Sequence, residues 1–267
     1  MSETTDPDGA PDRGIILVAT GASYVELARQ ALATIREQMP GCPVDLFTDD
    51  ASVDGFDRLH LIDNPHARSK VACMRLSRFH RTLYLDVDTL MVAPMWDVFE
   101  VLERFDIALA HDQTRVVWKV LRPLNFDLPE AFPQYNTGVV AWRRSPATDT
   151  FFDGWRARYE AGVVKEDQPS FREELWLSDL RVATLPPEYN LMNLRLMYAF
   201  FPKTAMARLI HSPRLHWHVK PSKGLKRLRR RRITGLRQLL GPFYHWRLTR
   251  QRAHRAELLR KLGKRSD

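Results

Sequence analysis

Residues 81–92 read Arg81-Thr-Leu-Tyr-Leu-Asp-Val-Asp-Thr-Leu-Met-Val92. An apolar run of this kind is typical of a strand buried in a sheet. Asp86 and Asp88 interrupt it, and carboxylates are costly to bury unless positive charge faces them. Because they are two positions apart on an extended backbone, both side chains point the same way, as a pair of oxygen ligands for Mg²⁺ or Mn²⁺ would. The structural alternative is that Asp86 ends a strand and Asp88 begins a turn.

The residues before this stretch alternate between strand and helix patterns. We expect strands over 14–20, 43–48, 58–62 and 81–86, and helices over 22–39 and 67–79. Repeated strand–helix units predict an α/β fold, with a mostly parallel central sheet flanked by helices. Ligands of such sheets bind at the carboxyl ends of the strands. Asp86 and Asp88 fall at such an end.

The second half of the sequence is less regular. It predicts helices over 98–105, 148–159 and 168–177, and strands over 107–110 and 207–210, the latter ending at His211. Residues 135–142 combine a polar turn with an apolar strand. No Gly-x-Gly-x-x-Gly follows the first strand, which argues against a dinucleotide dehydrogenase, and there is no Walker-type loop.

Charge is distributed unequally along the 267 residues. From Lys220 onward there are 17 Lys and Arg against two acids, whereas the first 219 residues carry a net charge of −6. We therefore expect a disordered N-terminus over 1–13, an α/β domain over 14–219 and a basic helical tail over 220–267. The two cysteines, Cys42 and Cys73, are too few for a disulfide framework and do not have the spacing of a metal site. Such cysteine usage is typical of proteins in a reducing cytoplasm.

The tail has apolar residues at roughly helical spacing, from Leu225 through Phe243 and Trp246 to Leu262, with Arg227–Arg232 between them. A basic amphipathic helix with aromatic residues is typical of proteins that bind an anionic membrane surface. The alternatives are nucleic-acid binding through phosphate contacts and a solvated helix docked on the body. We expect the membrane, and consider nucleic acid the weaker alternative.

Several ordered motifs over residues 14–220 resemble one known family. They are a first strand ending at Thr20 and followed by Tyr24, a helix bearing Lys70, Leu85-Asp-Val-Asp88, Asn136-Thr-Gly138, Asp167-Gln168, and a late strand ending in His211. This series resembles the nucleotide-sugar glycosyltransferases of the GT-A fold, and is most similar in layout to family 8, the glycogenin and bacterial galactosyltransferase type.

The resemblance implies a metal site. Asp86 and Asp88 resemble the Asp-x-Asp pair that binds a metal–diphosphate, with Asp86 also near the ribose, and His211 resembles the third protein ligand. The family pattern continues His-x-x-Gly-x-x-Lys-Pro. Here Lys220 follows His211 at nine residues and the glycine is absent. His216 and His218 therefore remain alternative ligands, and the contact of Lys220 with the diphosphate remains open.

The resemblance also implies donor contacts. Ala19, Thr20 and Tyr24 resemble contacts to the nucleotide base, and Lys70 resembles a basic residue near the donor phosphates or sugar. The alternatives are packing for Tyr24 and solvated surface for Lys70. A further set resembles the part of the family's site that holds the donor sugar: Asn136 and Gly138, which shape its pocket, and Asp167 and Gln168, which bind its hydroxyls. Asp167 could equally cap a helix.

The function implied by the resemblance is transfer of a sugar from a nucleotide diphosphate, a UDP-sugar, to a glycan or lipid-linked acceptor, with Mn²⁺ or Mg²⁺ as cofactor. Family 8 chemistry retains the anomeric configuration, whereas an inverting enzyme would need a base, for which Asp167 is the candidate. The alternatives are a haloacid dehalogenase-type phosphatase and a non-catalytic nucleotide-binding protein. The expected location is the cytoplasm, peripheral on the inner face of the cell membrane.

Overall fold

The computed structural model describes residues 11–66, 68–113, 125, 127–162, 167–194, 205–216 and 232–263. The chain forms two compact units. Unit 1 comprises Met1–Gly21, Cys42–Asp86 and Asp97–Pro187, and unit 2 comprises Ala22–Gly41, Val87–Trp96 and Glu188–Asp267. His218, Lys220 and the domain boundary predicted near residue 220 lie outside the described residues.

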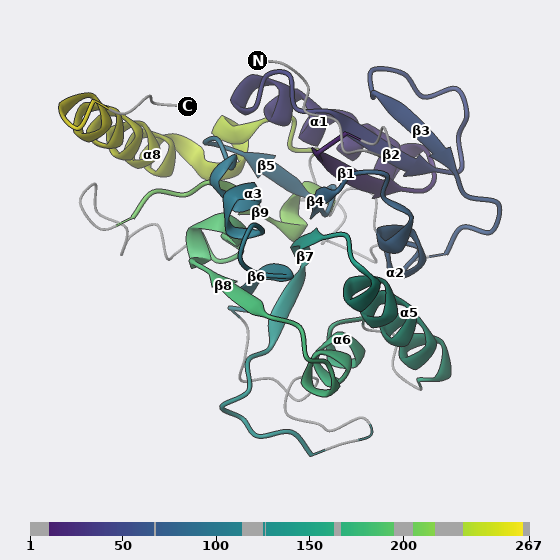
Figure 1. Cartoon of the computed structure of the whole chain (residues 1–267). Helices are drawn as coiled ribbons and strands as arrows, with labels where there is room; N and C mark the ends of the chain where they lie inside the picture. The colour runs from purple at the N-terminus through teal and green to yellow at the C-terminus, as the bar shows by residue number, and fades with distance from the viewer. Residues whose placement is uncertain are drawn as a thin grey trace, which may run out of the picture. The chain divides into compact units, whose positions relative to one another are not determined.

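Unit 1 is built on a seven-stranded sheet of order β3-β2-β1-β4-β7-β6-β8 (Figure 1). The strands are β1 (Arg13–Ala19), β2 (Val44–Thr48), β3 (Arg58–Leu61), β4 (Arg81–Leu85), β6 (Ile107–His111), β7 (Tyr135–Arg143) and β8 (Val182–Leu185). Within the described residues, four of the six neighbouring pairs are parallel, and β7 is antiparallel to both β4 and β6. The sheet confirms the predicted mostly parallel α/β class.

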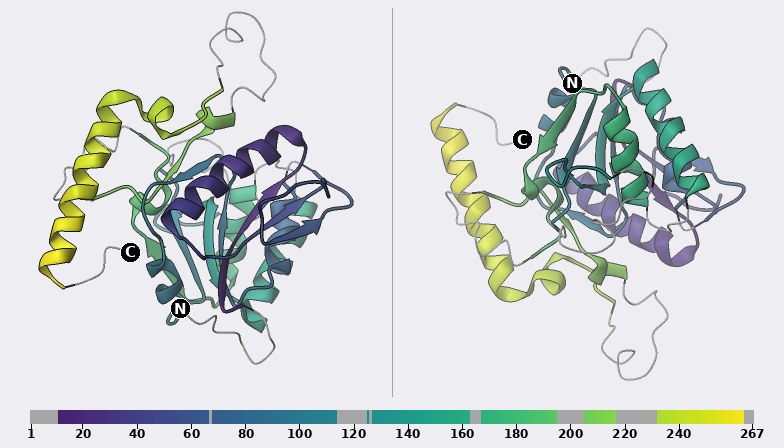
Figure 2. Two further views of the ribbon diagram at one scale, coloured as in Figure 1. Left: turned by 90° about the horizontal axis from the view of Figure 1, so that it is seen from above. Right: turned by 90° about the horizontal axis from the view of Figure 1, so that it is seen from below.

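The helices of unit 1 are α2 (Lys70–Cys73), α3 (Asp97–Val101), α5 (Pro146–Ala161) and α6 (Asp167–Leu177), and α5 and α6 lie side by side (Figures 1 and 2). The helix predicted over 67–79 is much shorter. A 3₁₀ turn at Met74–Leu76 follows α2, and Ser77 leaves the helical conformation with ψ of 136°. The Ser77 hydroxyl lies 2.7 Å from Thr82 Oγ1, so a side-chain contact forms where the helix was expected to continue.

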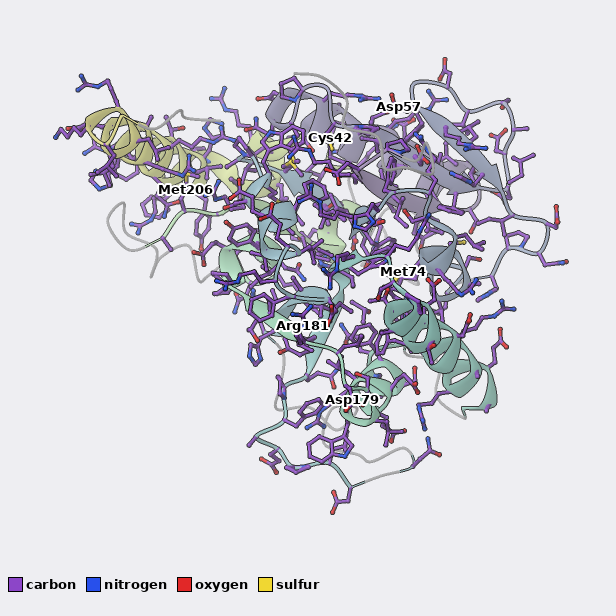
Figure 3. All side chains as sticks on the ribbon, in the orientation of Figure 1. Cys42, Asp57, Met74, Asp179, Arg181 and Met206 are labelled. Carbon is purple, nitrogen blue, oxygen red and sulfur yellow. The ribbon has the colours of Figure 1, made fainter. Side chains whose placement is uncertain are left out.

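The core of unit 1 lies between the sheet and these helices. It includes Met74, labelled in Figure 3, with Phe79, Trp142, Trp155 and Phe171. Both cysteines are buried and neither is in a disulfide, and burial raises the pKa of the Cys73 thiol to about 12. The burial of these apolar side chains is the main force that holds the sheet and helices together.

Strand β7 corrects one expectation. The segment Asn136-Thr-Gly138, predicted as a polar turn, lies inside the strand. The strand already begins at Tyr135 because this residue pairs with His111 of β6, past an irregularity in the register between Leu109 and His111. Asn136 Oδ1 does accept a hydrogen bond from the Gly138 N–H at 3.0 Å, which is the local turn-like contact that the sequence pattern favours.

Unit 2 contains α1 (Ala22–Gln38), β5 (Thr89–Met91), β9 (Leu209–His211), the 3₁₀ turn Pro213–His216 and α8 (Leu236–Lys261). All but the first residue of the 3₁₀ turn Pro187–Asn190 also belong to it. β5 and β9 form a two-stranded antiparallel sheet in which Thr89 pairs with His211. The apolar run 81–92 is thus two strands in two sheets, and Asp86-Val-Asp88 is the link between them.

Helix α8 confirms the predicted helical tail from Leu236 onward. The helix bends at Gly241, which has a φ of 72°, a backbone conformation that glycine adopts readily and other residues rarely do (Figure 2). Pro242 follows and cannot donate a helical hydrogen bond. Across the described residues we find no helix whose length and apolarity would let it cross a bilayer.

Candidate functional site

The carboxyl ends of β1 and β4 mark the switch point of the sheet. The chain moves from β1 outward through β2 and β3, then returns to place β4 on the other side of β1. Because β1 and β4 are parallel, Ala19 and Thr20 at the end of β1 and Asp86 after β4 lie at the same edge of the sheet. In open α/β sheets, ligands bind outside the strand ends at such a point.

Lys70 is the centre of the polar cluster at this edge in unit 1. Its buried Nζ lies 3.3 Å from Asp86 Oδ1, 3.1 Å from Asp167 Oδ2, and 3.2 Å from the carbonyl oxygen of Thr137. A fourth oxygen, Thr137 Oγ1, lies at 3.3 Å. Lys70 is therefore not a solvated surface lysine. It joins the ends of β4, β7 and α6 and orients two carboxylates.

Asp167 is held from three sides at the first turn of α6. Besides Lys70, its carboxylate contacts Arg68 Nε at 3.2 Å and accepts a hydrogen bond from the Thr137 hydroxyl at 2.6 Å. Burial would raise the pKa of Asp167, but Lys70 and Arg68 outweigh it and bring that pKa to about 2. Burial would lower the pKa of Lys70, but Asp167 and Asp86 raise it overall, so both groups are charged at neutral pH.

Asp86 is the more open member of this cluster. Its side chain is 27% exposed, it accepts a hydrogen bond from the Tyr84 hydroxyl, and its backbone N–H donates to the Gly138 carbonyl at 2.8 Å. The last contact ties the end of β4 to the backbone of β7. Asp86 thus keeps a fixed backbone position and a carboxylate accessible to a ligand.

Asp88 lies in unit 2 among two histidines. His211 Nε2 is 3.1 Å from Asp88 Oδ1, and His216 Nδ1 is 3.1 Å from Asp88 Oδ2. The backbone carbonyl of Asp88 accepts a hydrogen bond from the Ser212 N–H at 2.9 Å, next to the pairing of Thr89 with His211. Burial would raise the pKa of Asp88, but the two histidines outweigh it and hold that pKa well below its usual range.

The hydrogen bonding of His211 fits a cation ligand. Its Nδ1 lies 3.0 Å from Oδ1 of the fully buried Asn190, and its Nε2 faces Asp88 Oδ1. Both ring nitrogens therefore face acceptor oxygens, but a neutral imidazole has only one N–H and can donate to only one of them. With Nδ1–H donated to Asn190, the Nε2 lone pair and the carboxylate are suited to share a cation, as in metal sites whose histidines are oriented by an outer partner. Asp88 and His211 belong to a group of acidic and histidine side chains that could hold a divalent ion.

His216 has a different role from His211 in the same cluster. Its Nδ1 contacts the Asp88 carboxylate, and its Nε2 is buried with no hydrogen-bond partner among the described residues. The ring of Tyr24 meets it edge-on, with centroids 6.4 Å apart. Tyr24 is itself exposed, so one edge of its ring packs while the rest remains available to a ligand.

The remaining predicted residues are placed as follows. Asn136 is buried in β7, and Gln168 is half-buried in the first turn of α6, next to Asp167. Three residues that the sequence did not single out take part in the two clusters: Arg68, Thr137 and Asn190. Thr137 stands inside a predicted motif, whereas Arg68 and Asn190 follow no pattern that would have revealed them.

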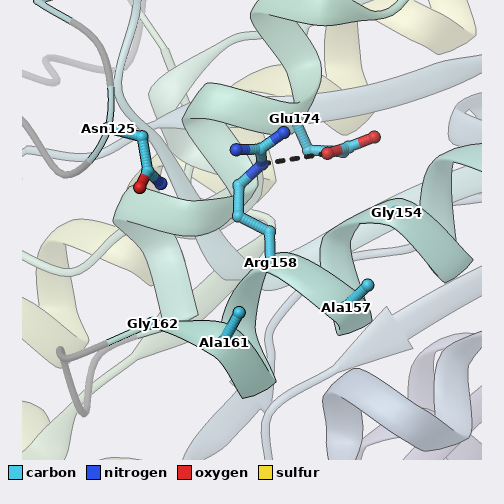
Figure 4. Close-up of a pocket in the computed structure, with 7 residues that line it drawn as sticks. All are labelled: Asn125, Gly154, Ala157, Arg158, Ala161, Gly162 and Glu174. Atoms are coloured by element: carbon cyan, nitrogen blue, oxygen red, sulfur yellow. Dashed lines mark hydrogen bonds and ion pairs between the residues drawn. The ribbon is translucent and has the colours of Figure 1, made fainter.

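A cavity of about 400 Å³ lies beside α5 and α6 in unit 1 (Figure 4). It is lined by Asn125, Gly154, Ala157, Arg158, Ala161, Gly162 and Glu174. Arg158 Nε is 3.0 Å from Glu174 and its guanidinium also approaches Glu173. The cavity contains none of the predicted site residues and its charges neutralise one another, so we do not take it as the active site.

Comparison with known proteins supports the fold. No family model matches the sequence, and no curated protein matches it. Solved structures do, among them the glycosyltransferase GlyE of Streptococcus pneumoniae TIGR4, with a TM-score of 0.57 at 13% identity. The chain has a glycosyltransferase-like fold. The match covers 96% of this chain but 66% of the GlyE chain, so this chain spans somewhat less than two thirds of the length of that protein.

Proposed function

We propose that this protein is a metal-dependent glycosyltransferase that moves a sugar from a nucleotide diphosphate donor, a UDP-sugar, to a glycan or lipid-linked acceptor. The observation that carries the proposal is the position of Asp86-Val-Asp88. The motif follows β4 at the switch point of a glycosyltransferase-like sheet, and Asp88 is paired with His211. The haloacid dehalogenase alternative is less favoured because its motif closes the first strand, whereas this one follows β4.

Asp86, Asp88 and His211 form the proposed ligand set for the cation. Two carboxylate oxygens and an imidazole nitrogen suit Mn²⁺ or Mg²⁺. Asp86 and Asp88 are separated by one residue, so the backbone keeps their Cα atoms within about 7 Å whatever the conformation. Such a cation would neutralise the charge that develops on the departing nucleoside diphosphate.

The environment of Asp167 supports a retaining reaction. A general base works best when its pKa lies near the operating pH. Asp167 has a pKa of about 2 and is enclosed by Lys70, Arg68 and Thr137, so it is poorly suited to take a proton from an acceptor. We propose instead that Asp167 and Gln168 line the donor-sugar pocket beside Asn136 and Gly138. Ala19, Thr20 and Tyr24 would contact the base and Lys220 the diphosphate. The cytoplasmic location stays a prediction.

Thermal shift tests donor binding. We expect one nucleoside diphosphate and its sugar to raise the Tm in the presence of Mn²⁺ and much less without it, because the metal and the diphosphate bind together. The panel includes the diphosphates of all common bases. If no diphosphate or nucleotide sugar raises the Tm with Mn²⁺ present, the donor-binding proposal fails.

Donor hydrolysis tests catalysis. Asp86→Ala should lower Mn²⁺-dependent sugar release by about 100-fold or more while leaving the Tm near that of wild type, because charge stabilisation in the transition state is lost. Asp153→Ala is the matched control, since Asp153 is an exposed carboxylate of unit 1. Full activity of Asp86→Ala, or full activity in excess chelator, would contradict the metal role. Phosphate release from a simple phosphomonoester would favour the phosphatase instead.

A further inference from the structure

Helix α8 already has a docked face. Leu239, Leu240, Leu248 and Gln251 are buried. Arg252 Nε donates to the Val92 carbonyl at 2.8 Å, which ties the same side of the helix to the segment after β5. Leu239, Leu240 and Leu248 therefore form the buried side of α8.

A second stripe on α8 is exposed. Phe243 and Trp246 are 47% and 55% exposed, and their ring centroids are 6.2 Å apart. Arg247 lies over the Phe243 ring at 5.8 Å, and Arg250 lies over the Trp246 ring at 5.6 Å. These four positions are spaced i, i+3, i+4 and i+7, so they form one face of a helix.

Single exposed apolar side chains are common on proteins, but adjoining, half-exposed large aromatics on one helical face are typical of a surface that binds a partner. The charge of the region limits what that partner can be. Helix α8 carries seven Lys and Arg against one acid, and the sequence from Lys220 onward carries 17 against two. The partner is therefore anionic and also able to receive aromatic rings.

We propose that Phe243, Trp246, Arg247 and Arg250 form a contact surface for an anionic lipid bilayer. Trp and Phe are favoured at the boundary between headgroups and acyl chains, and basic side chains on the same helix bind the acidic headgroups. The first 219 residues carry a net charge of −6, so an anionic surface attracts the C-terminal segment in preference to the rest of the chain. The inference does not depend on the proposed glycosyl transfer.

Co-sedimentation of the full chain with vesicles tests this surface. We expect pelleting with phosphatidylcholine vesicles that contain phosphatidylglycerol, and little with phosphatidylcholine alone. Replacing Arg247 and Arg250 by Gln should weaken binding by about 30-fold, at roughly 1 kcal/mol for each basic residue. Replacing Phe243 and Trp246 by Ala should weaken it by about tenfold or more through lost apolar burial.

Trp176→Ala is the matched control, because Trp176 is 47% exposed on α6 of unit 1 and should not affect binding. In wild type, we expect brominated lipid to quench tryptophan emission, and Trp246→Phe should remove most of that quenching. Equal pelleting with neutral and anionic vesicles would overturn the proposal. So would a loss of binding in Trp176→Ala equal to that in the Phe243/Trp246 variant.

A nucleic-acid partner gives a distinct result. Base stacking on the aromatic rings would make single-stranded DNA bind tightly and depend on Phe243 and Trp246. If DNA shows that dependence while anionic vesicles do not bind, the lipid assignment is wrong. If the arginine variant loses vesicle binding and the aromatic variant does not, the surface is a general anion site and the proposal also fails.

Discussion

Asn190 is the residue that sets the chemistry of His211. It is fully buried in the 3₁₀ turn before the bridge of Leu191 to Ile210, and its amide oxygen faces His211 Nδ1. A partner on one ring nitrogen fixes the tautomer and directs the other nitrogen to the ligand. Asn190 is therefore a positioning residue for the proposed cation site, although it does not contact the cation itself.

We expect Asn190→Ala to weaken Mn²⁺ binding by about tenfold or more, because His211 loses the partner that orients it. Isothermal titration calorimetry with Mn²⁺ alone measures the effect without any substrate. Asn193→Ala, which changes an exposed asparagine three residues away, should leave the affinity unchanged. An unaltered Kd in a folded Asn190→Ala protein would show that His211 does not need this orientation.

Among the elements of unit 1, β1 depends on a close approach of side chain to backbone. A Cβ built on Gly14 would lie 2.3 Å from Cε1 of Phe79, whose ring is fully buried. Gly154 in α5 presents a contrasting case, because a Cβ there would meet only the terminal atoms of Glu174, a flexible side chain. Gly14 is thus required by the packing of Phe79, whereas a larger residue should be tolerated at Gly154.

Gly14→Ala should lower the free energy of unfolding by about 2 kcal/mol, because the buried ring has no space into which to move. Gly154→Ala should stay within about 1 kcal/mol of wild type, since alanine favours the helix and Glu174 can rotate away. Urea unfolding of both variants measures the difference. Equal destabilisation by the two changes would contradict the close packing of Phe79 on β1.

At the scale of the whole molecule, the stability of the fold depends on pH through a buried charge cluster. Asp45 of β2 is completely buried, with Arg78 Nε at 2.8 Å and His60 Nε2 at 3.0 Å from its Oδ2. Burial would raise the pKa of Asp45, but hydrogen bonds from His60 and Arg78 outweigh it and lower that pKa below 3.8. Such a group contributes stability above its unfolded pKa and loses it as pH falls through the folded pKa.

Asp45→Asn should therefore cost about 3 kcal/mol at neutral pH, because it leaves Arg78 and His60 without their charged partner. The difference from wild type should shrink as the pH falls below 3.8, where the wild-type carboxyl itself becomes protonated. Unfolding curves at several pH values measure this convergence. A difference that stays constant into acid would show that Asp45 is not the titrating group.

Local pattern was informative wherever a physical requirement acts over a few residues. Apolar runs predicted β1, β2 and β4, because a strand covered on both faces is largely apolar along its length. The same pattern placed Asp86 after β4 and a helix in the basic tail. The turn expected at Asn136-Thr-Gly138 failed because pairing with β4 and β6 outweighed the local preference of those residues.

By itself, then, the sequence determined the α/β class, most of the strands and the position of the carboxylate pair, since these follow from the periodicity of apolar side chains. It did not reveal β8 or the division of residues 81–92 into β4 and β5. Only the tertiary structure decided which partners those carboxylates have. Lys70, Arg68 and Thr137 gather around Asp167, and Asn190 orients His211, through contacts between residues far apart in the chain. Such contacts depend on strand register and helix packing, which local periodicity does not encode.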